Sequence, residues 1–89
     1  MAWTIEYDRA AQKVAQKLSA ATQKRIRAFL EERLLSLSDP RQLGASLKGS
    51  ELGEYWRYRV GDYRIICDIQ YGRLVVLVIE IGHRSDVYR

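Results

Sequence analysis

Residues 56–65 read WRYRVGDYRI, and this stretch decides the fold. Aromatic and β-branched residues alternate with arginines on both sides of Gly61-Asp62, which is the pattern of two strands joined by a two-residue hairpin turn. Such a turn places Arg59 opposite Arg64, because directly opposed residues share a face of the sheet. One face of this hairpin is therefore apolar, and the other carries arginines.

The same reading extends to both sides of the hairpin. Residues 3–7 alternate as a short strand, and Asp8 and Ser19 are N-cap residues for two helices, the second of which ends before Asp39-Pro40. A loop rich in glycine and serine is expected over 39–53. Three further strands are expected at 55–60, 63–70 and 73–81, with a second two-residue turn at Tyr71-Gly72.

The order β-α-α-β-β-β predicts an α+β fold. A helical hairpin packs on one face of a largely antiparallel four-stranded sheet, and residues 1–89 form a single domain. One detail conflicts with this scheme, because the simple register places Glu80 on the apolar face. Either a β-bulge intervenes or that register is wrong.

Composition favours an anionic partner. The 89 residues carry a formal charge of +4, with a pI of about 9.5, which suits nucleic acid first and an acidic protein second. The single cysteine, Cys67, is expected to be buried in a strand, and one His with one Cys gives no recognisable metal site. With no signal peptide or membrane span in the sequence, we expect a cytoplasmic protein that needs neither cofactor nor membrane.

Arginines gather on one face of the predicted sheet. Arg57, Arg59 and Arg64 point the same way, and the direct opposition of Arg59 and Arg64 costs stability unless an anion lies between them. A phosphate group is the natural anion. The helical Lys and Arg residues, by contrast, are interpreted as a solvated polar face.

Residues 82–88 read GHRSDVY and add three groups suited to phosphoryl chemistry. The guanidinium of Arg84 can bind phosphate oxygens, Tyr88 can stack on a base or move a proton, and His83 titrates near neutral pH. Two of these residues also have a structural interpretation. His83 can simply hydrogen-bond at the strand end, and Tyr88 can be idle near the terminus.

Taken together, these segments resemble the RelE toxins of type II toxin-antitoxin systems, within the RelE/ParE superfamily. The resemblance rests on LKG at 47–49, on 56–65, on the apolar final strand and on 82–88, and it covers nearly the whole chain. It implies a metal-independent endoribonuclease that enters the ribosomal A site and cuts mRNA there. It also implies a separately encoded, RelB-like antitoxin that silences the toxin in a hetero-oligomeric complex.

The resemblance also implies roles for particular residues. Arg57 and Arg59 correspond to RNA phosphate-binding positions. The catalytic positions correspond to Arg64, Arg84 and Tyr88, with His83 as an additional titratable group. The best-known RelE toxin has lysines at the first two positions, whereas the arginines of this chain are poor bases. In the cleavage proposed for the family, the RNA 2′-hydroxyl attacks its adjacent phosphate, and Tyr88 or His83 handles the protons.

Two other functions fit the same sequence. A ParE-like inhibitor of DNA gyrase shares the fold and acts by binding a protein, although Arg84 and Tyr88 argue against it. A non-catalytic member of the fold would only bind its antitoxin through the basic surface.

Overall fold

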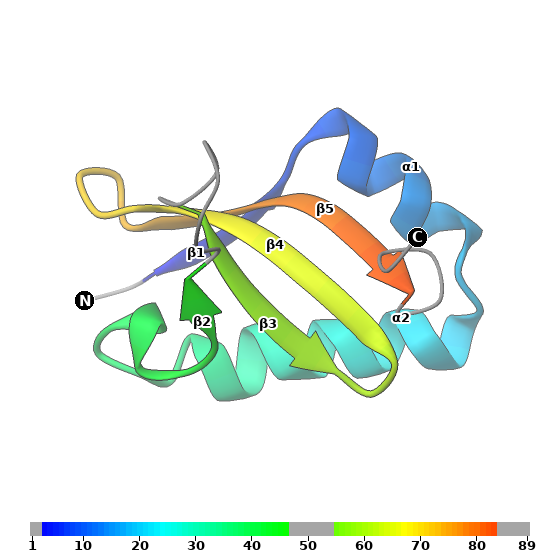
Figure 1. The fold of residues 1–89 in the computed structure, drawn as a ribbon, viewed down its shortest axis with the longest axis horizontal. Coiled ribbons are helices and arrows are strands. Elements are labelled where there is room, and N and C mark those ends of the chain that lie inside the picture. Colours follow the sequence, from blue (N-terminus) through cyan, green and yellow to red (C-terminus); the bar gives the residue numbers. More distant parts are fainter. Residues whose placement is uncertain (1–2, 47–54, 84–89) are drawn as a thin grey trace.

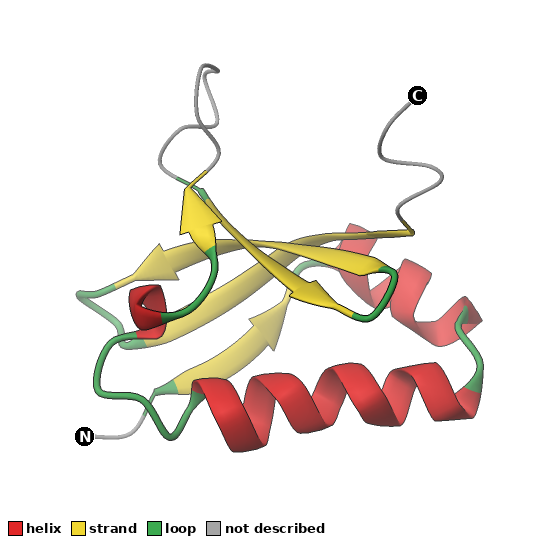
Figure 2. Ribbon diagram, turned by 60° about the horizontal axis from the view of Figure 1, so that its bottom comes forward, coloured by secondary structure: helices red, strands yellow, loops and turns green. Residues whose placement is uncertain are grey.

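The computed structural model describes residues 3–46 and 55–83 of the chain. One five-stranded sheet has the order β1-β5-β4-β3-β2, and the helices lie together on one side of it (Figures 1 and 2). The α+β class, the helical hairpin and the largely antiparallel sheet are as predicted. The elements are β1 (Thr4–Tyr7), α1 (Arg9–Lys17), α2 (Ala20–Ala28), a π-helical turn η1 (Phe29–Leu34), a 3-10 turn η2 (Pro40–Gln42), β2 (Ala45–Ser46), β3 (Trp56–Val60), β4 (Tyr63–Gln70) and β5 (Val75–His83).

The prediction of four strands is wrong, because β2 adds a fifth inside the segment interpreted as a loop. Ala45 pairs with Arg57 and Ser46 pairs with Trp56, both antiparallel. Two small residues carry no strand pattern of their own, so the pairing depends on tertiary contact. Gly44 permits that contact through its positive φ of 78°, since a Cβ atom there would lie 2.3 Å from the Arg57 carbonyl oxygen.

Both helices begin at the predicted caps. The Asp8 carboxylate accepts a hydrogen bond from the Ala11 N–H at 2.9 Å, and the Ser19 hydroxyl accepts one from the Thr22 N–H at 3.2 Å. Helix α1 buries Ala11 completely but leaves Val14 38% exposed. Only part of α1 therefore reaches the core.

Helix α2 continues into the π-helical turn η1 rather than ending as a regular α-helix. The Leu35 N–H donates to the Leu30 carbonyl at 3.2 Å, five residues earlier. This winding keeps Ile26, Leu30 and Leu34 buried along one line against the sheet. We call this covered side of the sheet the helix face.

The core lies between that helix face and the helices. Tyr58, Val60, Ile65 and Cys67 project into it from β3 and β4, so the side assigned to them from sequence is correct. The Tyr58 hydroxyl donates to the Pro40 carbonyl at 2.7 Å, which ties η2 to the sheet. Burial raises the pKa of the Cys67 thiol well above its usual range, so the thiol stays protonated.

The connection between β4 and β5 differs from the predicted two-residue turn. Gln70 pairs with Val75, so four residues form the turn, and Leu74 has a left-handed φ of 55°. The Leu74 carbonyl accepts the Thr4 N–H at 2.9 Å, and the Leu74 side chain packs against the core. The turn is thus set by contacts with β1 and the core, which a local pattern does not reveal.

A β-bulge resolves the conflict at Glu80. The β4–β5 register shifts between Ile66 and Cys67, where Val78 pairs with Cys67 and Glu80 pairs with Ile66. Ile79 is the extra residue, so Glu80 moves to the face opposite the core. Of the two explanations that the sequence left open, the bulge is correct for Glu80.

Strand β1 pairs parallel with β5, from Thr4 opposite Val75 to Tyr7 opposite Val78. This pairing makes β5 an inner strand with neighbours on both sides, consistent with its nearly continuous apolar run. Among the residues that the structure describes, no helix has the length and apolar character needed to cross a membrane.

Candidate functional site

Three arginines share the face of the sheet opposite the helices, which we call the arginine face. Arg59 of β3 lies directly opposite Arg64 of β4, and Arg57 lies opposite Ile66, as the sequence predicted. Opposed residues in an antiparallel pair have Cα atoms about 4.5–5.5 Å apart, so the side chains start close together. The Gly61-Asp62 turn fixes this register, with Gly61 at a positive φ of 59°.

The three positive charges affect one another. Partial burial lowers the pKa of the Arg64 guanidinium below its usual value, and the like charges of Arg57 and Arg59 lower it further. Arg59 is exposed, whereas Arg57 and Arg64 are half-buried. An anion placed among them would relieve the repulsion, so the arrangement favours the binding of phosphate or carboxylate.

Apolar residues lie beside the arginines on the same face. Ile66 and Val75 are both buried there, at 7% and 4% exposure, and Leu77 is half-buried. A low-dielectric floor strengthens the interaction of the neighbouring guanidinium groups with a bound anion.

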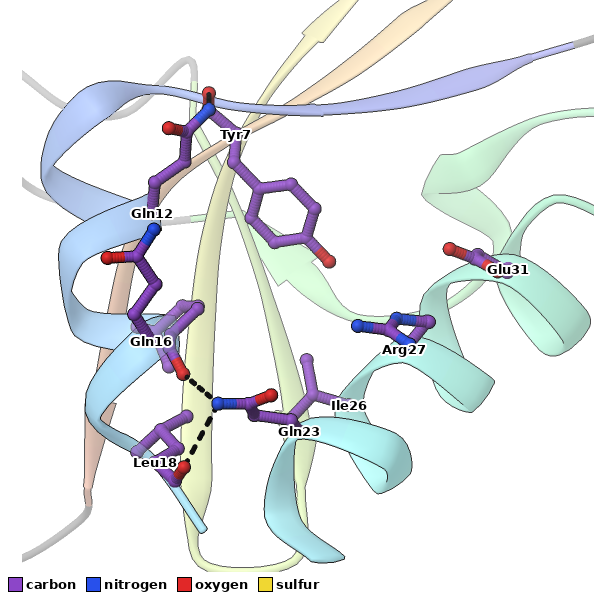
Figure 3. Close-up of a pocket in the computed structure, with 10 residues that line it drawn as sticks. Tyr7, Gln12, Gln16, Leu18, Gln23, Ile26, Arg27 and Glu31 are labelled. Atoms are coloured by element: carbon purple, nitrogen blue, oxygen red, sulfur yellow. Dashed lines mark hydrogen bonds between the residues drawn. The ribbon is translucent and has the colours of Figure 1, made fainter. Parts of the chain in front are cut away.

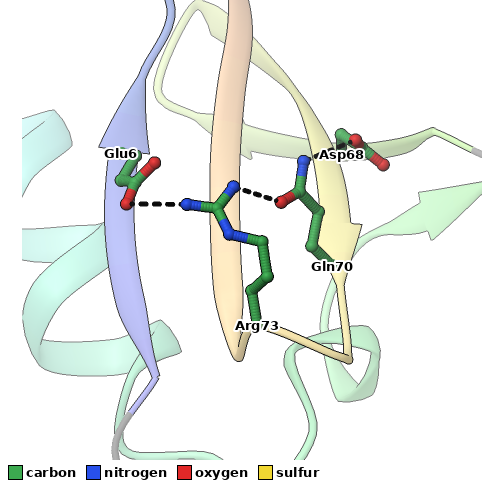
Figure 4. Close-up of polar contacts among 4 residues, drawn as sticks. All are labelled: Glu6, Asp68, Gln70 and Arg73. Carbon is green, nitrogen blue, oxygen red and sulfur yellow. Dashed lines mark hydrogen bonds and ion pairs between the residues drawn. The ribbon is translucent and has the colours of Figure 1, made fainter.

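The other end of the arginine face carries a polar network that the site prediction missed (Figure 4). Arg73 makes an ion pair of 3.5 Å with Glu6 and donates to the Gln70 side chain at 2.8 Å, while Gln70 donates to Asp68 at 3.0 Å. Arg64, Asp68 and Gln70 are separated by even numbers of residues, so they share one face of β4. This spacing in the sequence could have indicated the network. With carboxylates at this end, the anion-binding region is restricted to the end with the arginines.

His83 does not join the arginines on their face. It pairs with Tyr63 at the end of β5, and the two rings meet edge to face at 5.1 Å. Tyr63 shares the helix face with Ile65, whereas the preceding Gly82 pairs with Arg64. Arg84, Tyr88 and the 47–49 segment lie outside the described residues.

A separate cavity of about 240 Å³ opens between α1 and α2 on the helix side (Figure 3). The Gln23 side-chain amide spans part of it and donates to the carbonyls of Ala15 and Leu18 at 2.7 and 3.0 Å. Burial, and secondarily the Glu31 carboxylate, raises the pKa of the Tyr7 hydroxyl that lines it. Of the residues predicted for catalysis, the two that the structure describes, Arg64 and His83, do not line this cavity.

The metal-ligating residue types do not gather in the described part of the chain. Across 3–46 and 55–83, no three His, Cys, Asp or Glu side chains come together in a way that could hold an ion. On the arginine face, the guanidinium groups can stabilise negative charge and orient an anion.

Helices on one face of a sheet and converging arginines on the other define a small, basic α+β protein with an anion-attracting surface. Residues 5–88 match the family described as the ParE toxin of the type II toxin-antitoxin system parDE. The chain belongs to this family, within the RelE/ParE superfamily of toxins. No curated protein sequence matches the chain significantly.

Solved structures of RelE toxins have the same fold. A chain of the toxin-antitoxin complex RelBE2 from Mycobacterium tuberculosis is similar with a TM-score of 0.82 at 23% identity, covering 97% of this chain and 95% of that one. The isolated Escherichia coli RelE toxin gives 0.71 at 25% identity, covering 98% and 92%. The RelB-RelE complex from Methanococcus jannaschii gives 0.69 at 22% identity, covering 93% and 94%.

Proposed function

We propose that this toxin is a metal-independent endoribonuclease that cleaves mRNA in the ribosomal A site. The observation that carries the proposal is the opposition of Arg59 and Arg64, with Arg57 beside them on the same face. A gyrase inhibitor that acts by protein binding has no need for three mutually repelling guanidinium groups. A phosphodiester is the anion whose geometry suits them.

In the proposed cleavage step the arginines bind phosphate and stabilise negative charge, but they do not accept a proton. The RNA 2′-oxygen attacks the adjacent phosphorus, the bond from phosphorus to the 5′-oxygen breaks, and the products are a 2′,3′-cyclic phosphate and a free 5′-hydroxyl. Arg64 and Arg84 stabilise the charge that develops on the phosphoryl oxygens, while Arg57 and Arg59 hold the RNA phosphates. The guanidinium groups remain protonated and therefore do not act as the base.

Two protons must move in this step. One leaves the 2′-hydroxyl, and one reaches the departing 5′-oxygen. Tyr88 and His83 are the candidate groups. Because His83 contacts Tyr63 at the end of β5 while Gly82 occupies the position opposite Arg64, we favour Tyr88 as the group that accepts the 2′ proton.

The proposal includes partners as well as chemistry. We infer that a separately encoded, RelB-like antitoxin binds this toxin in a hetero-oligomer and that the target is the cytoplasmic ribosome with its message. The similar structures include complexes of RelE with RelB, which supports the choice of antitoxin.

The first test is primer extension on a defined message, with and without ribosomes. We expect cuts within A-site codons only when ribosomes are present. Any weak cutting of naked RNA at high protein concentration should persist in EDTA, because the proposed cleavage is metal-independent.

Arg64→Ala should lower the cleavage rate by about 10²–10³-fold, the usual cost of losing one group that stabilises a transition state. Arg9→Ala on α1 is the matched control. Normal cleavage by a folded Arg64→Ala variant would remove Arg64 from the site.

A second pair of variants separates the two proton-transfer candidates. Tyr88→Phe keeps the ring for stacking and removes the hydroxyl, so single-turnover cleavage should fall by about 10²-fold or more if Tyr88 moves the proton. His83→Gln should change the rate and its pH profile little. The reverse result, with Tyr88→Phe active and His83→Gln inactive, would assign the proton to His83.

Gyrase inhibition is the second candidate, favoured by the match of residues 5–88 to the ParE toxin family. A supercoiling assay with purified gyrase tests it directly. Loss of supercoiling, together with intact message on ribosomes, would establish the gyrase target and overturn the proposed cleavage.

A further inference from the structure

The cavity between α1 and α2 has the make-up of a small ligand site. Its volume of about 240 Å³ is below the roughly 300–1,000 Å³ of pockets for drug-sized molecules, so it suits a ligand of one or two rings. Apolar side chains from both helices and from β5 line it: Ala15, Leu18, Ile26 and Ile81. A flat apolar body would therefore find matching surfaces inside.

The Gln23 side chain presents an oriented acceptor to this cavity. Its amide nitrogen donates to the carbonyls of Ala15 and Leu18 at 2.7 and 3.0 Å, so both amide hydrogens are engaged. The amide oxygen faces away from α1, on the side where Tyr7 and Arg27 lie (Figure 3). Within residues 3–46 and 55–83 this oxygen accepts no hydrogen bond, which leaves it available to a donor of the ligand.

The Tyr7 hydroxyl supplies a donor to the same cavity. Tyr7 is half-buried, and its hydroxyl makes no hydrogen bond to any other residue that the structure describes. Burial raises the pKa of this hydroxyl, and the Glu31 carboxylate raises it further, so the proton is retained at neutral pH. The cavity thus offers one acceptor and one donor for the polar edge of a ligand.

The charges around the cavity balance. Arg27 and Glu31 are its charged lining residues, both are exposed, and their charges have opposite sign. The other polar lining groups are neutral, and they include the amides of Gln12 and Gln16. A lining without net charge gives no advantage to an anion such as a polyphosphate. The part of the ligand that enters the cavity is accordingly uncharged.

We propose that this cavity binds a nucleobase that carries an amino group beside a ring nitrogen, as adenine and cytosine do. The amino group donates to the Gln23 oxygen, and the ring nitrogen accepts from the Tyr7 hydroxyl. Hypoxanthine and uracil have a carbonyl oxygen in place of the amino group, and that oxygen would face the Gln23 oxygen without a proton between them. The cavity lies on the helix side of the sheet, away from the arginine face, so the inference does not rest on RNA cleavage.

The test uses the intact, ¹⁵N-labelled toxin and two nucleosides that differ at one group, adenosine and inosine. NMR titration follows the side-chain amide signals of Gln23. Adenosine should shift them with a Kd below about 1 mM, and inosine should bind about tenfold or more weakly, the cost of one unmade hydrogen bond. Cytidine and uridine form a second pair with the same expected order. Equal affinities within both pairs, or no shift by any of the four nucleosides, would overturn the inference.

Matched protein variants locate the donor. Tyr7→Phe keeps the ring and removes the hydroxyl, so the Kd for adenosine should rise about tenfold. Tyr71→Phe is the control, because its hydroxyl donates to Asp39 at 2.9 Å and does not line the cavity. Its Kd should equal that of the parent. Unchanged adenosine affinity in a folded Tyr7→Phe variant would contradict the proposed recognition.

A third experiment identifies the source of the base. A 2′-O-methylated oligoadenylate has no free 2′-hydroxyl, so the proposed cleavage cannot consume it. If it shifts the Gln23 signals at lower concentration than adenosine does, the cavity takes an unpaired base of RNA. If adenosine alone shifts them, the ligand is a free nucleoside. Shifts confined to Arg57, Arg59 and Arg64 with both ligands would show that the cavity binds no base, and the inference would fail.

Discussion

Arg59 and Arg64 are a pair of residues whose opposition across a hairpin can be predicted from the sequence. Their opposition follows from the length of the Gly61-Asp62 turn alone, so the sequence predicts it. The side occupied by His83 does not follow in the same way, because it depends on the bulge at Ile79. A bulge reverses the alternation of every residue beyond it, and no residue type marks its position uniquely.

Relief of the repulsion at this pair should be measurable in the free protein. Arg59→Gln keeps most of the side-chain length and removes one charge, so the free energy of unfolding at low salt should rise by about 0.2–1 kcal/mol. Urea unfolding at low and high salt checks this, because the gain should shrink as salt screens the charges. A variant that is less stable than the parent at low salt would show that the pair is not strained. Arg9→Gln is the control.

The two-residue strand β2 is too short for a sequence pattern to predict it. The five-residue β3 and the eight-residue β4 have enough alternation to be read directly. β2 has only Ala45 and Ser46, and its existence depends on Gly44 approaching Arg57 and on the Trp56 indole, which donates to the Leu43 carbonyl at 2.6 Å. Such contacts join residues that are distant along the chain, so a local pattern cannot contain them.

Gly44 is accordingly the residue on which β2 should depend most. Gly44→Ala places a methyl group against the Arg57 carbonyl oxygen at a backbone conformation that alanine rarely adopts. We expect a loss of about 1–3 kcal/mol or more in unfolding free energy, or roughly 4–8 °C in Tm for each kcal/mol. Gly72→Ala is the control, because nothing lies within 4 Å of its added Cβ. Equal melting temperatures for the two variants would contradict the close approach.

At the scale of the whole molecule, the buried titratable groups predict alkaline instability. Burial raises the pKa of Cys67 from an ordinary value of 9.0, and it raises the pKa of Tyr58 and Tyr7 from 10.0. A raised pKa means that the unfolded chain loses its proton first, so this part of the stability is complete below about pH 9 and declines as the pH rises further.

The measurement is urea unfolding at pH 7, 9 and 10.5. Unfolding free energy should be nearly constant between the first two values and then fall steeply. Cys67→Ala, though less stable at every pH, should show a shallower decline between pH 9 and 10.5 because one titrating group is gone. Identical declines in the parent and the variant would indicate that the thiol is not the group responsible.

The order of the strands has a consequence for how the protein is made. Residues 4–7 of β1 have their partners at residues 75–78, and β5 stands between β1 and β4. During synthesis the amino-terminal part emerges first, yet β1 has no partner strand, and β4 is paired on one side only, until β5 has been translated. An unfinished chain therefore lacks the strand that joins β1 to the rest of the sheet. Each toxin chain therefore completes its fold only near the end of its synthesis. A partner protein that is already present can bind the chain during that interval.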